Sequence, residues 1–206
     1  MLQAFINEFI LLFVAIDPIG TVPLLAALTR GMDEPTRRRL VTRGVTIAAC
    51  VLFSFAIFGQ LLLTALGVSF ASFRIAGGVL LFLVGVQMVF QAHSAEDKHN
   101  LGEFGGRDLA IFPIALPYIA GPGAILAVMV VMRGAPDISN FMLKCVTLAT
   151  VMGVTLWLLL STSRLNRLLG RTGSEVIARV MGILLAALAA ESVVRGILEA
   201  LGRAPL

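Results

Sequence analysis

Residues 13–23 read FVAIDPIGTVP, and they interrupt an apolar stretch long enough to cross a membrane. Proline lacks a backbone N–H and its ring clashes with the carbonyl four residues before it, so Pro18 leaves the carbonyl of Val14 without a helical partner. Gly20 permits backbone angles that other residues resist, and Pro23 suits the first turn of a new helix. The stretch therefore predicts a helix that stops, a short linker, and a helix that restarts at membrane depth.

The composition of the whole chain is that of a membrane protein. Of its 206 residues 58% are hydrophobic and only 14% are charged, whereas soluble domains average about 25% charged residues. The mean hydropathy is +0.97. A helix needs about 20 apolar residues to cross a hydrocarbon core of roughly 30 Å, and runs of that length recur along the chain. We expect an all-helical protein with six spans, at residues 3–29, 40–66, 69–91, 110–132, 141–163 and 177–200.

Basic residues are distributed unevenly between the connections. Eleven Lys or Arg residues lie on the side of the first connection and five on the other side. Because cytoplasmic connections are enriched in Lys and Arg, this distribution predicts both termini on the outer face. The basic residues do not form a continuous stripe with aromatic residues, which argues against a nucleic-acid partner and leaves membrane lipid as the expected surroundings.

The two halves of the chain contain similar segments in the same order. Self-similarity at a fixed spacing indicates duplication, and a repeat of three spans must enter the membrane from the opposite face the second time. Such inverted repeats are typical of transporters. The predicted units are residues 1–91, a cytoplasmic connection at 92–109 and residues 110–206. The matching segments, at offsets of 99, 101 and 105 residues, are PIGTVP and PYIAGP, RGVTIA and KCVTLA, and RIAG and RVMG.

A second interruption, LPYIAGPGAI at residues 116–125, occupies the corresponding place in the second half. Pro117 is expected to end a helix and Pro122 to restart it, with Gly121 and Gly123 supplying conformational freedom. Backbone groups exposed at membrane depth are tolerated only where protein or water satisfies them. Paired Gly/Pro interruptions in two halves therefore predict a central binding site, with both helices discontinuous near the bilayer midplane.

The two predicted interruptions offer partial charges of both signs. The restarted half-helices present N–H groups and a positive dipole end, which suit a carboxylate. The ends of the first half-helices present carbonyls, which suit an ammonium, so a zwitterionic amino acid satisfies both; these residues alone do not select amino acids over other small polar solutes. The residues expected to bind substrate are Asp17, Pro18, Ile19, Gly20, Thr21, Thr46, Pro117, Tyr118, Ala120, Gly121, Gly123 and Ala124.

Asp17 is the only carboxylate deep in a predicted span, and ionisable residues at such positions are functional by default. Three roles stay open for it: capping the restarted half-helix, binding the substrate ammonium, and carrying a coupling proton. No nucleophile, base and orienting acid share one depth, so we do not expect an enzyme. No cofactor or metal site is expected either, because Cys50 and Cys145 lie in apolar segments and His93 and His99 lie in the connection.

The motifs DPIGTVPLLAALT and FPIALPYIAGPGAI resemble those of the MarC family of bacterial inner-membrane proteins, which includes the SnatA small neutral amino acid transporters. The resemblance covers essentially the whole chain and implies transport of glycine, alanine, serine or similar amino acids by alternating access. An exporter of another small metabolite or drug and a non-transporting ligand-binding or scaffold protein are the alternatives. The coupling ion, the direction of transport and the oligomeric state stay open. The family motifs point to Asp17, Pro18, Gly20, Pro23, Pro117, Gly121, Pro122, Gly123 and Ala124.

Overall fold

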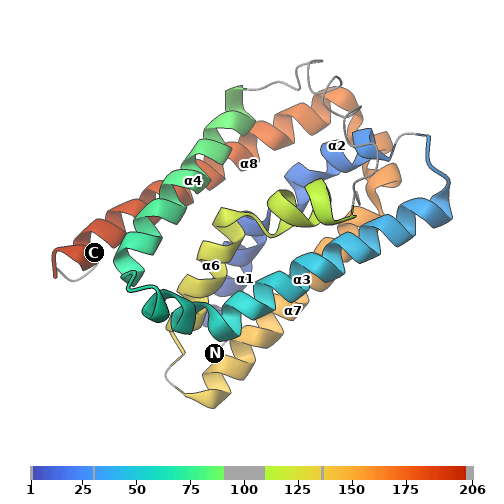
Figure 1. The fold of residues 1–206 in the computed structure, drawn as a ribbon. Coiled ribbons are helices and arrows are strands. Elements are labelled where there is room, and N and C mark those ends of the chain that lie inside the picture. Colours follow the sequence, from blue (N-terminus) through green and yellow to red (C-terminus); the bar gives the residue numbers. More distant parts are fainter. Residues whose placement is uncertain (1, 30, 91–109, 136, 203–206) are drawn as a thin grey trace.

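The computed structural model describes residues 2–29, 31–90, 110–135 and 137–202 (Figure 1). All regular elements in these ranges are helices, as the composition predicts. The predicted connection at 92–109, with His93 and His99, lies outside the described residues. The helices are α1 (Leu2–Ile16), α2 (Pro18–Leu28), α3 (Glu34–Ala65), α4 (Phe70–Phe90), η2 (Ala110–Ile119, a π-helix), α6 (Pro122–Arg133), α7 (Ile138–Leu160) and α8 (Thr162–Ala200).

Five helical segments of the described residues are long and apolar enough to cross a membrane. They agree closely with five of the six predicted spans, while the remaining predicted span, 110–132, is divided between η2 and the short helix α6. The five segments are Gln3–Ala26, Glu34–Ala65, Phe70–Phe90, Ile138–Leu160 and Glu175–Ala200.

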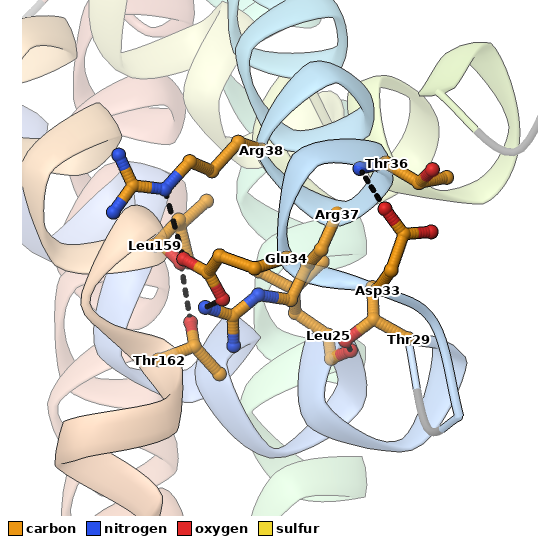
Figure 2. Close-up of polar contacts among 9 residues, drawn as sticks. All are labelled: Leu25, Thr29, Asp33, Glu34, Thr36, Arg37, Arg38, Leu159 and Thr162. Carbon is orange, nitrogen blue, oxygen red and sulfur yellow. Dashed lines mark hydrogen bonds and ion pairs between the residues drawn. The ribbon is translucent and has the colours of Figure 1, made fainter.

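Two helices continue well beyond the predicted spans. Helix α3 begins at Glu34 rather than at residue 40, because Asp33 accepts a hydrogen bond of 3.3 Å from the Thr36 amide and caps the helix (Figure 2). Glu34 also accepts a 2.8 Å hydrogen bond from Arg38, which lies four residues further along the same helix. Helix α8 begins at Thr162 rather than at residue 177. Hydropathy identifies only the apolar part of a helix, so these polar turns were missed.

The helices form two outer pairs with shorter segments between them. Helix α4 packs along α8, and α3 packs along α7 (Figure 1). Helix α2 contacts α7 and α8, while α6 contacts α3 and α4. The four shorter segments, α1, α2, η2 and α6, therefore fill the space between the two pairs.

Helices α4 and α8 cross at van der Waals distance because small residues lie at their contact. A Cβ atom on Gly85 would lie 2.7 Å from the carbonyl oxygen of Gly182, and a Cβ atom on Gly182 would lie 2.8 Å from the carbonyl oxygen of Gly85. Further along, Gly196 faces the carbonyl of Ala71, so residue numbers rise on α4 as they fall on α8. The two helices are antiparallel and held at a separation that side chains would prevent.

Apolar side chains occupy the outside of the bundle as well as its core. Leu12, Leu52 and Leu148 are completely buried, whereas Phe58 and Trp157 are exposed. Helices that are apolar on all sides suit a lipid environment, because their outward faces do not need water. The distribution agrees with the membrane class predicted from composition.

Candidate functional site

The first junction, between α1 and α2, is made by one residue. Asp17 has a φ of 47°, a left-handed conformation that is uncommon outside glycine. Its amide donates a 3.0 Å hydrogen bond to the Phe13 carbonyl and completes α1. Its carbonyl accepts a 3.2 Å hydrogen bond from the Thr21 amide and begins α2. Asp17 therefore ends one helix and starts the next without a linker.

The Asp17 side chain caps the helix that it starts. Its Oδ1 atom accepts a 3.0 Å hydrogen bond from the Gly20 amide, and the Thr21 hydroxyl donates a 2.9 Å hydrogen bond to the Asp17 carbonyl. Only 9% of Asp17 is exposed. The second carboxylate oxygen, Oδ2, accepts no hydrogen bond from the described residues. Of the three roles left open by the sequence, capping is thus present, and one oxygen remains for another partner.

The second junction, between η2 and α6, has no side chain in the capping position. Gly121 stands there in an extended conformation, and Pro122 is the first residue of α6. The first helical hydrogen bond runs from the Ile125 amide to the Gly121 carbonyl at 3.0 Å. Gly123 and Ala124 are buried, and their amides find no acceptor among the described residues. This helix N-terminus therefore presents two unpaired donors inside the protein.

The structure corrects the predicted roles of two prolines. Helix α2 begins at Pro18, so Pro23 lies within the helix and the predicted restart at Pro23 is wrong. Pro117 lies within η2, so the predicted end of a helix at that residue is also wrong. Pro122 begins α6 as predicted. A missing N–H costs little in the first turn of a helix, and this position is the one that Pro18 and Pro122 share.

The π-helix brings the chain to the second junction. Its wider turn pairs each amide with the carbonyl five residues before it, as the Ala120 amide does with the Ala115 carbonyl at 2.9 Å. Pi-helical turns are rare and are frequently found at functional sites. Pro18 and Pro122, the first residues of α2 and α6, are 104 positions apart, which is close to the offsets of 101 and 105 between the other matching segments.

The two junctions belong to one hydrophobic core. Helix α1 packs against α6, and α2 packs against η2. Ile16 and Val22 from the first junction and Ile119 and Ala124 from the second share a single cluster of buried residues. Of the predicted site residues, Ala120 and Ala124 belong to this cluster; Asp17, Pro18, Ile19, Gly20 and Thr21 lie at the first junction, and Gly121 and Gly123 lie at the second.

Two other predicted residues face away from the core. Thr46 is exposed and donates its hydroxyl to the Thr42 carbonyl of its own helix at 2.8 Å. Tyr118 is 48% exposed. Thr147, which matches Thr46 in the repeat, is completely buried and bonds the Leu143 carbonyl at 3.0 Å. The sequence match between the two threonines does not predict which of them points inward.

A buried ion pair that the sequence did not reveal connects three helices at the end of the bundle that holds the last turn of α6. Lys144 on α7 is only 7% exposed. Its Nζ atom donates a 2.6 Å hydrogen bond to Glu8 Oε1 on α1 and a 2.9 Å hydrogen bond to the Val131 carbonyl on α6. Buried charges require such partners. The pair is 136 positions apart in sequence, so no local pattern indicated it.

A second ion-pair group connects three helices at the same end. Glu199 on α8 pairs with Arg133 on α6 and lies 3.7 Å from Arg74 on α4. The Arg133 guanidinium also stands 4.2 Å from the ring centroid of Phe70. Both polar groups therefore meet the last turn of α6, the helix that carries the uncapped N-terminus at its other end.

The described residues contain no group of three or more His, Cys, Asp or Glu side chains able to hold a metal ion. The polar groups at the two junctions include backbone donors and acceptors and the buried Asp17 carboxylate. Such a set can bind a small polar molecule.

The helical fold, with five segments able to cross a membrane, defines an integral membrane protein. Residues 2–201 match the model of the MarC family of integral membrane proteins. The chain belongs to the MarC family. This finding confirms the resemblance carried by the two proline-containing motifs.

Similar proteins occur in archaea and bacteria. UPF0056 membrane protein MJ1677 of Methanocaldococcus jannaschii is 35% identical over 97% of this chain and 98% of its own length. A UPF0056 membrane protein of Archaeoglobus fulgidus is also 35% identical, over 97% of this chain and 95% of its own. The UPF0056 inner membrane protein YhgN of Escherichia coli K12 is 29% identical over 93% and 95% of the two chains. No solved structure matches the chain.

Proposed function

We propose that this protein is a secondary transporter of small neutral amino acids, of the glycine, alanine and serine type, and that it works by alternating access. The observation that carries the proposal is the pair of helix N-termini in one core, one capped by the Asp17 carboxylate and the other uncapped at Gly121. The first junction offers a negative group and the second offers unpaired donors. A zwitterion with a short side chain complements both.

The packing of the helices supports an inverted repeat, with its two discontinuous helices near the bilayer midplane. In such a repeat α2 corresponds to α6, α3 to α7 and α4 to α8. The contacts of α2 with α7 and α8 then correspond to contacts of α6 with α3 and α4, and both sets occur. The pairs α4–α8 and α3–α7 join equivalent helices, and α4 runs antiparallel to α8, as opposite insertion requires. Inverted repeats that meet at such discontinuous helices are the usual architecture of secondary transporters.

The substrate groups can be assigned to the two junctions. The Gly123 and Ala124 amides, at the positive end of α6, would bind the carboxylate. Asp17 Oδ2 and the carbonyls at the end of α1, one of which faces Pro18 and has no amide partner, would bind the ammonium. Glycine and alanine residues at the second junction leave room for the substrate backbone to approach the amides closely.

The membrane and the orientation are part of the proposal. The relative YhgN is named an inner membrane protein. We place this chain likewise in the bacterial inner membrane, with both termini on the outer face, on the grounds of the distribution of basic residues. A proton or another ion would couple transport, with Asp17 as the candidate carrier.

Uptake by proteoliposomes tests the function. The purified protein should accumulate labelled glycine well beyond one molecule per protein, and unlabelled alanine and serine should compete. Gly121→Val should abolish uptake, because a β-branched side chain would stand where the uncapped amides open. Gly153→Val is the matched control, since Gly153 lies on an exposed helix face with nothing within 4 Å of an added Cβ. Uptake that saturates at one molecule per protein would instead indicate a ligand-binding protein. Competition only by unrelated solutes would indicate an exporter of another small metabolite or drug.

Asp17→Asn tests coupling separately. Asparagine can still accept the hydrogen bond from the Gly20 amide and tolerates the left-handed conformation, so the junction keeps its shape. The variant should lose accumulation driven by a pH gradient and keep exchange of labelled for unlabelled glycine. Accumulation equal to that of the wild type would refute a proton carried by Asp17.

A further inference from the structure

We propose that two side chains of α4, Leu81 and Met88, set the upper limit on the size of the transported side chain. The inference rests on the proposed amino acid transport and adds the residues that determine its specificity. Neither residue is indicated by the sequence, because leucine and methionine in an apolar span have no distinguishing pattern.

Each of the two side chains contacts the glycine of one junction. A Cβ atom on Gly123 would overlap the Cδ1 atom of Leu81. A Cβ atom on Gly20 would lie 2.7 Å from the Cε atom of Met88 and would overlap the Asp17 carboxylate. Leu81 and Met88 therefore lie directly against the backbone beside the amides and carboxylate that we assign to the substrate.

The two residues lie on one face of α4 and each adjoins a different junction. They are seven positions apart on α4, which puts them on one face with a separation of about 10 Å along the helix axis. One face of α4 thus passes both junctions and forms an apolar surface beside the proposed site. Leu81 and Met88 also share a packed cluster with Leu185 and Ala189 of α8 and Val14 of α1.

The face of α4 that carries Leu81 and Met88 also packs closely against α8. Gly85, between Leu81 and Met88 in sequence, touches the backbone of Gly182 and Ala186 on α8. Helix α4 therefore cannot move toward α8 to make room for a larger substrate side chain. Only rearrangement of the Leu81 and Met88 side chains can change the space beside the junctions, and methionine is the more adaptable of the two because it is unbranched.

An apolar surface of this kind discriminates by volume. One methylene more or less in an apolar pocket changes the specificity ratio by roughly 10–200-fold. Replacement of Leu81 or Met88 by alanine removes three heavy atoms from the surface. We therefore expect either variant to raise the uptake of valine relative to glycine by at least about tenfold, the lower end of that range.

The experiment measures initial uptake of glycine, alanine, valine and leucine by proteoliposomes containing Leu81→Ala or Met88→Ala. The matched controls are Leu83→Ala on the exposed face of α4 and Met142→Ala on α7, since Leu83 and Met142 are 58% and 56% exposed. The controls should keep the wild-type order of substrates. Leu81→Val, a smaller truncation, should give an intermediate ratio and provides a test if the alanine variant does not fold.

The outcomes separate the size limit from the transport function. If the wild type takes up none of the four amino acids, the proposed function fails. If the wild type transports glycine and the folded Leu81 and Met88 variants keep its valine-to-glycine ratio within twofold, the size limit is overturned while transport stands. An equal rise of the ratio in the Leu83 and Met142 controls would also overturn it, because loosening of the whole bundle would then explain the change.

Discussion

Removal of the Lys144 ammonium should destabilise the fold more than the removal of any other charge described above. Lys144→Met keeps the length and apolar stem of the side chain but deletes the group that binds Glu8 and the Val131 carbonyl. The variant leaves Glu8, whose side chain is 20% exposed, as an unpaired carboxylate. It also leaves the Val131 carbonyl at the end of α6 with one partner fewer.

The magnitude follows from these two losses. Breaking a buried ion pair by removing one partner costs about 3–5 kcal/mol, and the partial exposure of Glu8 places this pair at the lower end. An unsatisfied carbonyl would add about 1–3 kcal/mol, but Val131 keeps the 3.2 Å hydrogen bond from the Gly134 amide. We expect a loss of about 3 kcal/mol, or roughly a hundredfold in the unfolding equilibrium constant.

Reversible unfolding in mixed detergent micelles, followed by tryptophan fluorescence and circular dichroism, measures this loss. Trp157 is the only tryptophan of the chain and lies on α7, the helix that carries Lys144. The double variant Glu8→Gln, Lys144→Met removes both charges and should recover more than half of the loss. Equal stabilities of the wild type and Lys144→Met would refute the assignment of a buried, interacting pair. Strict additivity of the two single substitutions would also refute it.

Two further predictions concern helix contacts and helix ends. Gly85→Ala should lower the thermal midpoint of unfolding, because the added Cβ meets backbone atoms of α8. Gly153→Ala should raise the midpoint slightly, because its Cβ meets nothing within 4 Å and alanine is more favourable than glycine in a helix by about 1 kcal/mol. Thermal unfolding of both variants measures these opposite shifts. Hydrogen bonds from the side chain and amide of Thr36 hold the pKa of Asp33 below its ordinary value. The ionised carboxyl therefore stabilises the fold above its unfolded pKa of about 4, and this stabilisation is lost as the pH falls through the folded pKa. The destabilisation caused by Asp33→Ala should accordingly shrink below about pH 4. Asp33→Asn should destabilise the fold little at any pH.

The spans could be predicted because membrane helices are apolar on every side. Hydropathy therefore located the cores of α3, α4 and α7 within a few residues. The helix ends were less accessible, because polar turns outside the apolar part leave no hydropathy signal. The start of α3 has a different sequence signal, the capping residue Asp33 followed by Pro35 in the first turn. Hydropathy does not detect this signal.

The proline roles could not be derived from spacing alone. A proline can end a helix, begin one or lie within it, and the choice depends on which residue caps the helix. Asp17 adopts a positive φ, which is rare enough that a sequence argument assigns it to a nearby glycine instead. As a consequence the sequence predicts a helix end at Pro18, where α2 in fact begins.

Contacts between distant segments could not be derived at all. Thr46 and Thr147 match in sequence, yet Thr46 is exposed and Thr147 is buried. Which face of a helix is buried depends on the helices that pack against it. Leu81, Met88 and Glu8 gain their importance only from residues on other helices. The helix interruptions could be predicted from the sequence because glycine and proline act on their own backbone. Packing contacts and ion pairs could not be predicted, because they depend on residues brought together only by the tertiary structure.

The difference between the two junctions is what makes the proposed site suit a zwitterion. Each helix N-terminus carries a partial positive charge of roughly half an elementary unit. If glycine stood at both capping positions, two positive ends would share one core and an ammonium would have no anionic partner. Asp17 neutralises the end of α2 and keeps an unused oxygen, while Gly121 leaves the end of α6 open to a carboxylate. In the proposed inverted repeat, an asymmetric substrate would thus be bound because one capping residue differs between the two halves.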